Sequence, residues 1–146
     1  MHVLAIWCLA TTAALIYCAG TATAASDLPP ARIAAIGFEN RGWTVERSYD
    51  GASLVPPTAV SRMTFTNGRI EGTPGCGFLF ASYTLSGAHL TIASFGFFLG
   101  GYCPDDILSQ SKSITKALSG ELTIERDGQR VVLRDAQGTI QVILRP

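Results

Sequence analysis

The chain has 146 residues, with 11 lysines and arginines and 11 aspartates and glutamates, so its formal net charge is zero. A neutral chain without a basic stripe has little to neutralise a phosphate backbone, which argues against a nucleic-acid partner. Its length suits one domain behind a leader.

The first residues are typical of a secretory signal. Residues 3–19 are nearly all apolar, and small residues follow up to Ala24 in an A-x-A cleavage pattern. We predict a signal peptide over 1–24, cleavage near Ala24, and a periplasmic or secreted protein. Two alternatives stay open: a leader that remains as a membrane anchor, and lipid attachment at Cys18, although the preceding Tyr17 is bulky for a lipoprotein signal. No membrane span is expected in the mature chain.

The mature chain is predicted to begin with a linker over 25–34, where paired prolines disfavour helix, followed by a domain over 35–146. Alternating apolar and polar residues around Trp43 predict a strand with one buried face. Residues 49–57 contain two turn signals, Asp50-Gly51 and Pro56-Pro57, and we expect a loop there.

Glycine turns then divide the chain into hairpins. Asn67-Gly68 joins predicted strands over 61–65 and 69–72, and Ser86-Gly87 joins strands over 78–83 and 89–92. A dense apolar stretch follows over 95–99. Three short strands close the chain, over 122–125, 131–133 and 139–144.

One helix is predicted between these hairpins, over about 104–118. Pro104 and two aspartates suit its first turn, apolar residues recur at helical spacing up to Leu118, and Gly120 suits the C-terminal cap. The predicted fold class is β-rich α+β: an antiparallel, barrel-like sheet of hairpins packed on this one helix.

Two of the four cysteines lie in the leader, which leaves Cys76 and Cys103, each at a predicted turn. A small exported domain with two thiols favours one structural disulfide. A redox-active pair is the competing interpretation, but the Cys-x-x-Cys spacing is absent. Closing a loop of roughly 28 residues stabilises a fold by about 3.5 kcal/mol in the chain-entropy treatment.

No catalytic constellation emerges from the sequence. His89 is the one histidine outside the leader, it lacks a nucleophile motif, and we expect a solvent-facing strand residue. One histidine and two disulfide-bonded cysteines make no zinc site. Asp105 and Asp106 are adjacent on a helix and diverge by about 100°, so they oppose the helix dipole and form no carboxylate pair. We expect no enzyme and no cofactor or metal.

The aromatic residues around the two cysteines have two interpretations. Strand alternation places Phe78 with Phe80 on one face and Phe95 with Phe97 on one face, and it turns Phe98 the other way. Core filling is the ordinary explanation. The alternative is an exposed apolar patch near the disulfide, made of Phe95, Phe97, Phe98 and Tyr102, that docks a protein, a peptide or a lipid.

The order of these motifs resembles the META domain, also called the heat-shock protein HslJ-like family, from about residue 35 to the C-terminus. The matching segments are Gly42-Trp43, Thr64-Phe65, the glycine-rich turn over 72–76, the hairpin over 83–92, Cys103-Pro104 before two aspartates, and the strands over 128–138. The chain departs from the family pattern at Gly77, where relatives usually carry asparagine, and over 97–102, where they usually carry threonine and small residues.

The resemblance implies a small exported domain tied to stress tolerance, with no established enzymatic activity common to the family. We therefore expect a non-enzymatic, monomeric domain that acts in envelope stress tolerance or binds an unknown protein, peptide or lipid of the envelope. The alternative is a small periplasmic or secreted inhibitor of a hydrolase, which would present the proline-rich loop over 49–60.

Overall fold

The structure is a computed structural model that describes residues 37–146. The predicted signal peptide over 1–24, the lipidation alternative at Cys18 and the linker over 25–34 lie outside the described residues. No helix within residues 37–146 is long and apolar enough to cross a membrane.

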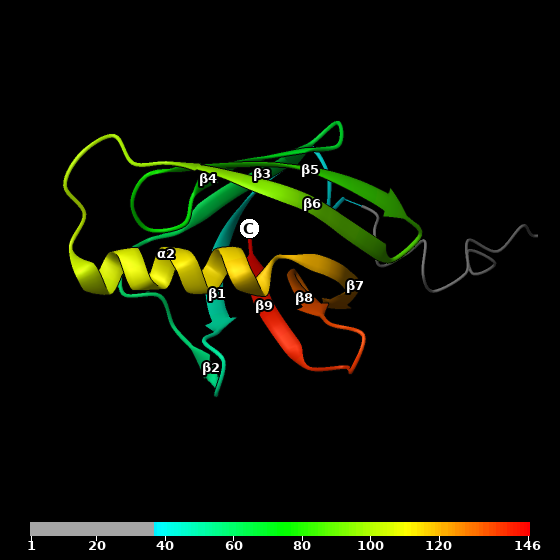
Figure 1. Ribbon diagram of the computed structural model, residues 1–146. Helices are drawn as coiled ribbons and strands as arrows, with labels where there is room; N and C mark the ends of the chain where they lie inside the picture. The colour runs from blue at the N-terminus through cyan, green and yellow to red at the C-terminus, as the bar shows by residue number, and fades with distance from the viewer. Residues whose placement is uncertain (1–36) are drawn as a thin grey trace, which may run out of the picture.

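The described chain forms short antiparallel strands and one helix (Figure 1). In chain order these are β1 (Arg41–Tyr49), β2 (Leu54–Val55), β3 (Arg62–Thr66), β4 (Arg69–Thr73), β5 (Phe78–Ser86), β6 (His89–Phe98), α2 (Asp105–Ala117), β7 (Gly120–Asp127), β8 (Arg130–Arg134) and β9 (Ile140–Arg145).

The sheet closes on itself. The strands pair in the order β1, β3, β4, β5, β6, β7, β8 and β9, and β9 pairs back with β1. Every strand except β2 therefore belongs to a closed barrel. The Asn67-Gly68 turn works as predicted, because φ is 49° and 76° at these two residues and a two-residue hairpin turn of this type needs positive φ at both. The predicted fold class, a β-rich α+β barrel with one helix, is confirmed.

The segment over 49–57 differs in detail from the expected loop, because it contains β2. Ser48 pairs with Val55, and Tyr49 pairs with Leu54, which makes a short hairpin that extends β1 beyond the barrel. The Asp50 side chain organises its turn by accepting hydrogen bonds from the backbone N–H groups of Ala52 and Ser53, both at 2.8 Å. These bonds favour the ionised carboxylate and lower the pKa of Asp50.

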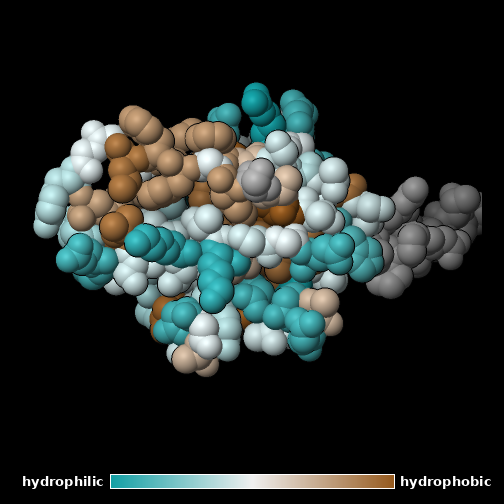
Figure 2. All heavy atoms as spheres, viewed as in Figure 1, coloured by the Kyte–Doolittle hydropathy of each residue, from teal (hydrophilic) through white to brown (hydrophobic). Residues whose placement is uncertain are grey.

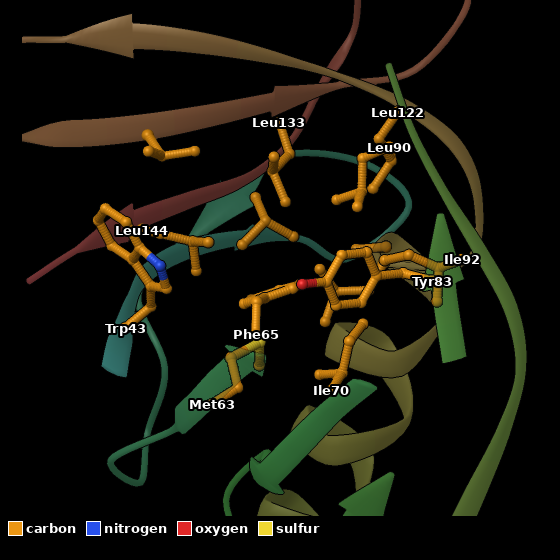
Figure 3. Packing of buried hydrophobic residues seen from close by; sticks show 14 of the residues in the cluster. Trp43, Met63, Phe65, Ile70, Tyr83, Leu90, Ile92, Leu122, Leu133 and Leu144 are labelled. Carbon is orange, nitrogen blue, oxygen red and sulfur yellow. The ribbon is translucent and has the colours of Figure 1, made fainter. Parts of the chain in front are cut away.

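The barrel interior is filled by the inward residues of the alternating strands (Figure 3). Trp43 is buried at the end nearest the N-terminal segment, where its Nε1 donates to the carbonyl oxygen of Phe38 at 2.9 Å. The ring of Phe38 packs on that of Phe65, with 4.5 Å between centroids. One hydrogen-bonded aromatic group therefore closes this end of the core.

Helix α2 lies between the layer of β4, β5 and β6 and the strands β1, β8 and β9 (Figure 1). It packs on β1 and β9. Its buried face consists of Ser111, Ile114 and Ala117, and Leu118 follows directly after the helix as a buried residue. Asp105 and Asp106 occupy the first turn and Lys116 the last, the arrangement that the helix dipole favours.

Strand β6 carries an irregularity that decides where its aromatic residues point. Ile92 pairs with Tyr83, yet Phe95 pairs with Ala81, so β6 has one residue more than β5 between these pairs. A bulge of this kind reverses the alternation of the residues that follow it. Phe95 therefore faces inward like Ile92, and Phe98 faces outward.

Candidate binding surface

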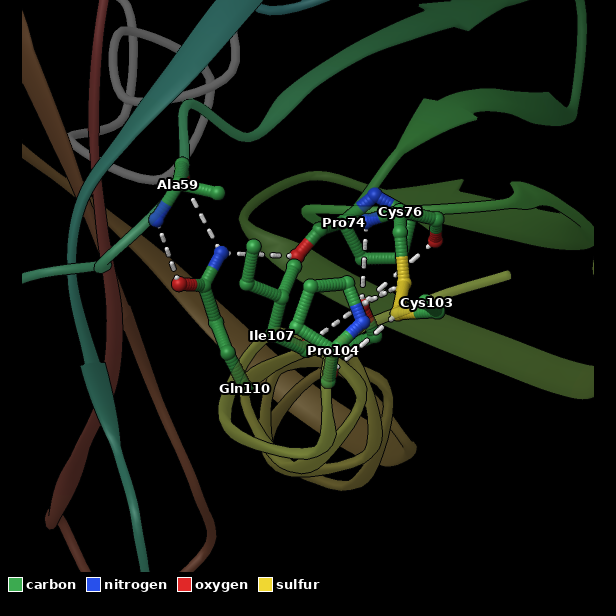
Figure 4. The surroundings of a disulfide bond; sticks show 8 residues. Ala59, Pro74, Cys76, Cys103, Pro104, Ile107 and Gln110 are labelled. Atoms are coloured by element: carbon green, nitrogen blue, oxygen red, sulfur yellow. Dashed lines mark hydrogen bonds between the residues drawn. A yellow bond between two sulfur atoms is a disulfide. The ribbon is translucent and has the colours of Figure 1, made fainter. Parts of the chain in front are cut away.

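The predicted disulfide is present. Cys76 and Cys103 are bonded, with 6.2 Å between their Cα atoms, and the bond ties the turn between β4 and β5 to the residues just before α2 (Figure 4). This confirms the expected link between the glycine-rich turn and the start of the helix. The backbone N–H of Cys76 also donates to Ser111 Oγ on the helix, at 3.3 Å.

Gln110 fastens the same region through its side-chain amide (Figure 4). Its Oε1 accepts from the backbone N–H of Ala59 at 2.9 Å, and its Nε2 donates to the carbonyl oxygens of Ala59 at 2.8 Å and Pro74 at 3.0 Å. One helix residue therefore holds both the loop before β3 and the turn that carries Cys76. Sequence reasoning missed Gln110, since no motif distinguishes it from an ordinary polar helix residue.

Beside the disulfide, the outer face of β5 and β6 is aromatic. Phe78 pairs with Phe98 across the two strands, and the rings of Phe78 and Phe80 lie 6.4 Å apart. Phe80 covers Gly96, where a Cβ atom would lie only 2.1 Å from the ring, so glycine is required for this packing. Phe98 is 65% exposed and Phe80 50%, so these rings cover the strands without being covered themselves.

We call this surface the aromatic patch. Its members are exposed large apolar residues on β5, at the end of β6 and in the loop after β6: Phe78, Phe80, Phe98, Leu99 and Tyr102. Phe97 is also exposed, but it pairs with the buried Leu79 and therefore lies on the opposite face of β6. Figure 2 shows hydrophobic side chains gathered over this part of the molecule, in contrast to the hydrophilic surface around α2. Exposed apolar surface of this kind makes the patch a candidate interaction site.

The four residues predicted for a binding patch are placed differently from one another. Phe97, Phe98 and Tyr102 are exposed, Tyr102 almost completely at 94%. Phe95 is half-buried and packs against the core. Phe78 and Phe80 join the exposed set from the neighbouring strand, which the sequence pattern alone did not indicate.

The residues considered for catalysis lie apart from this surface. His89 is exposed at the start of β6, opposite Ser86 and Thr123 on its neighbouring strands. Nearby Asp135 uses its carboxylate in a turn, where it accepts from the backbone N–H groups of Gln137 and Thr139 at 3.0 and 2.8 Å. Within residues 37–146, no three side chains of histidine, cysteine, aspartate or glutamate gather as metal ligands.

One partly buried polar pair joins β5 to the residues just before β1. The Tyr83 hydroxyl donates to the carboxylate of Glu39. Burial, together with this hydrogen bond and the negative charge of Glu39, raises the pKa of Tyr83 well above its usual value. The tyrosine is therefore a fixed donor that holds Glu39, just before β1, on the barrel.

Known proteins agree with this architecture. No curated relative matches the chain. A solved structure described as "NMR structure of the protein from Burkholderia xenovorans" is similar with a TM-score of 0.60 at 14% identity, covering 96% of this chain and 97% of that one. Another, described as "NMR structure of the protein", has a TM-score of 0.53 at 14% identity and covers 74% of this chain and 90% of its own.

At this level of identity, the two similar structures establish the fold alone. The sequence itself carries the family: the META domain profile matches residues 37–145, which are nearly all of the described residues and well over half of the chain. The chain therefore belongs to the META domain family.

Proposed function

We propose that this META domain is an exported, non-enzymatic binding module of the cell envelope, and that it contacts its partner through the aromatic patch. The disulfide supports an oxidising compartment, because such bonds persist outside the cytoplasm. The apolar leader with its A-x-A pattern supports export as well, because it is typical of a secretory signal. A role in envelope stress tolerance follows from the family resemblance.

The observation that carries the proposal is the exposure of the aromatic patch beside a complete core. Large rings such as Phe38, Trp43 and Phe65 already fill the barrel, so the phenylalanines of the patch are not needed there. Leaving apolar surface in water costs roughly 25 cal/mol per Å² relative to burying it. A partner that covers the patch recovers this free energy on binding.

The non-enzymatic part of the proposal has separate support. His89 faces solvent on a strand, the Asp135 carboxylate is occupied by its turn, and neither belongs to an arrangement of nucleophile, base and orienting acid among the described residues. Turnover of a generic ester, peptide or glycan substrate that disappears in a His89→Ala variant would overturn it.

The test is crosslinking and pull-down from the envelope fraction with wild-type protein and a Phe98→Ser variant. The variant should fold like the wild type, since Phe98 is mostly exposed, and should lose the crosslinked partner. Phe95→Ser is the matched comparison, because it removes a ring that packs on the core and should lower stability instead. Unchanged partner capture by Phe98→Ser would refute the patch. The intact mass of the bait reports leader cleavage, lipidation and disulfide formation.

A second candidate, an inhibitor of a hydrolase, is favoured by the order of the loop over 49–60. The Asp50 turn, the β2 hairpin and the Gln110 contacts to Ala59 hold this loop in one conformation, as a rigid inhibitory segment requires. Replacing the loop should then abolish sub-micromolar binding to a purified hydrolase. Val60→Ser probes the same loop at an apolar side chain that is 64% exposed, and it should leave partner capture by the aromatic patch unchanged.

A further inference from the structure

A cleft of about 340 Å³ separates α2 from the C-terminal half of β6. Its walls are Phe97 on the strand side and, on the helix side, Ser111, Lys112, Thr115, Lys116 and Ser119. The cleft exists because β6 and β7 diverge: β7 pairs with β6 only from His89 to Ile92, whereas β6 continues to Phe98. The helix packs on β1 and β9 and does not take the place of the missing strand.

The edge of β6 in this cleft has backbone groups without a strand partner. The backbone N–H of Tyr83 donates to the carbonyl oxygen of Gly68, the residue just before β4, and β4 and β5 continue in the same register. The odd-numbered residues of β5 therefore turn their backbone groups toward β4 and the even-numbered ones toward β6. Phe78 and Phe80 therefore bond to their partners Phe98 and Gly96 on β6.

The N–H and C=O groups of the two intervening β6 residues, Phe95 and Phe97, point to the opposite edge. Within the described part of the chain, no strand pairs with that edge beyond Ile92. An edge of this kind is a template for a further strand.

The helix side of the cleft is basic. Lys112 and Lys116 are four residues apart, hence on one face of α2, and neither forms an ion pair within residues 37–146. The hydroxyls of Thr115 and Ser119 instead donate to helix carbonyl oxygens, each at 2.8 Å. Two unpaired ammonium groups are thus the available charges opposite the free edge.

We propose that an extended acidic peptide segment of a partner protein adds to β6 as a strand in this cleft. Its main chain bonds to the backbone of Phe95 and Phe97, and its carboxylates pair with Lys112 and Lys116. The spacing agrees, because alternate residues of a strand lie about 6.6–6.8 Å apart and lysines four residues apart on a helix lie about 6 Å apart along its axis. This inference names the partner chemistry for the binding role proposed above.

Two other occupants fit the cleft less well. An acyl chain would desolvate the backbone groups of Phe95 and Phe97 without giving them hydrogen bonds, which is unfavourable. A second copy of the chain would meet the cleft with the same surface under two-fold symmetry, which would bring Lys112 and Lys116 of both copies together.

The experiment is a fluorescence anisotropy titration of the protein, as isolated from expressing cells, with a labelled peptide of alternating glutamate and threonine. The control peptide alternates lysine and threonine. The acidic peptide should bind and the basic one should not, and Lys116→Glu should weaken acidic binding at least tenfold. Arg145→Glu is the matched control: it reverses one exposed charge on β9, away from the cleft, and should change the affinity less than twofold.

A set of singly N-methylated acidic peptides tests the added strand without altering the protein. Only every second backbone N–H of an added strand faces β6. Methylating one of these N–H groups should therefore abolish binding, whereas methylating an N–H that faces away from β6 should leave binding unchanged. Equal binding of acidic and basic peptides, equal effects of Lys116→Glu and Arg145→Glu, or no alternation among the methylated peptides would overturn the inference. Two further results would overturn the inference if the acidic peptide does not bind. One is binding to lipid vesicles that is lost in Lys116→Glu. The other is a concentration-dependent dimer that is lost in the same variant.

The Phe98→Ser variant separates this inference from the proposed function. Its ring lies on the outer face and not in the cleft, so peptide affinity should be unchanged. Partner capture lost in Phe98→Ser without acidic-peptide binding would refute only the cleft. Peptide binding without any patch-dependent partner would refute only the patch.

Discussion

Removing the disulfide with a paired Cys76→Ser and Cys103→Ser substitution should destabilise the domain substantially. The two residues are 27 positions apart, and the loop between them contains β5 and β6. Closing a loop of this length in the unfolded chain is worth about 3.5 kcal/mol in the chain-entropy treatment. The net stability of a small domain is about 5–15 kcal/mol, so the loss is a large fraction of it.

This loss is large enough to measure by heat or by denaturant. One kcal/mol shifts the Tm of a domain of 60–100 residues by about 4–8 °C, so we expect the Tm to fall by about 15 °C or somewhat less in this slightly longer chain. Circular dichroism melts and urea unfolding should be recorded for the oxidised protein, the reduced protein and the double variant. The last two should agree, because both lack the crosslink.

Two results would refute the reasoning. A difference in unfolding free energy below about 1 kcal/mol between oxidised and double-variant protein would show that the crosslink does not restrict the unfolded chain as the loop-closure treatment requires. Free thiols at Cys76 and Cys103 in the exported protein, detected by alkylation and intact mass, would show that the bond is not part of the working molecule.

Other substitutions test individual contacts. Gly96→Ala should cost about 1 kcal/mol or less in urea unfolding, since the added methyl group displaces the half-exposed Phe80 ring, and a Gly96→Ala/Phe80→Ala double variant should recover part of the loss. Gln110→Ala should cost about 1–3 kcal/mol by leaving partly buried backbone groups unpaired, and faster proteolysis within residues 56–60 would accompany it. Tyr83 has a raised pKa, so its contribution to stability is fully present below about pH 10 and is lost as the pH rises above it. Wild type should therefore lose more stability than Tyr83→Phe between pH 8 and 11, and equal losses would contradict this.

The hairpins of the fold were predictable from sequence because their turns have a local chemical signature. Asn67-Gly68 tolerates positive φ, and the flanking residues alternate between apolar and polar. The helix was equally clear from Pro104, the two aspartates and the apolar spacing. Barrel closure was less accessible, because the pairing of β1 with β9 joins the two ends of the domain and depends on the curvature of the whole sheet.

The candidate surface was only partly predictable for a related reason. Strand β5 is apolar on both faces near its start, with Leu79 and Ala81 buried and Phe78 and Phe80 exposed, so alternation cannot say which set faces the core. Gln110 is still harder, since its partners Ala59 and Pro74 are 51 and 36 residues away in sequence. Such a contact becomes visible only when the helix, the turn and the loop are placed together.

The contrast along β5 and β6 supports the proposed interaction surface more strongly than exposure alone. Toward the Ser86-Gly87 turn, the outer face of these strands is polar, with Ser82, Thr84 and Thr91 exposed. Toward the disulfide the same face is aromatic. A strand face that only contacts solvent would be expected to carry polar residues such as serine and threonine along its whole length. The change occurs at the β6 bulge, which turns Phe98 outward and also lies where β6 loses its pairing with β7. One irregularity therefore turns Phe98 onto the aromatic patch and marks the start of the free strand edge beside α2, so the two proposed contact surfaces meet at the same end of β6.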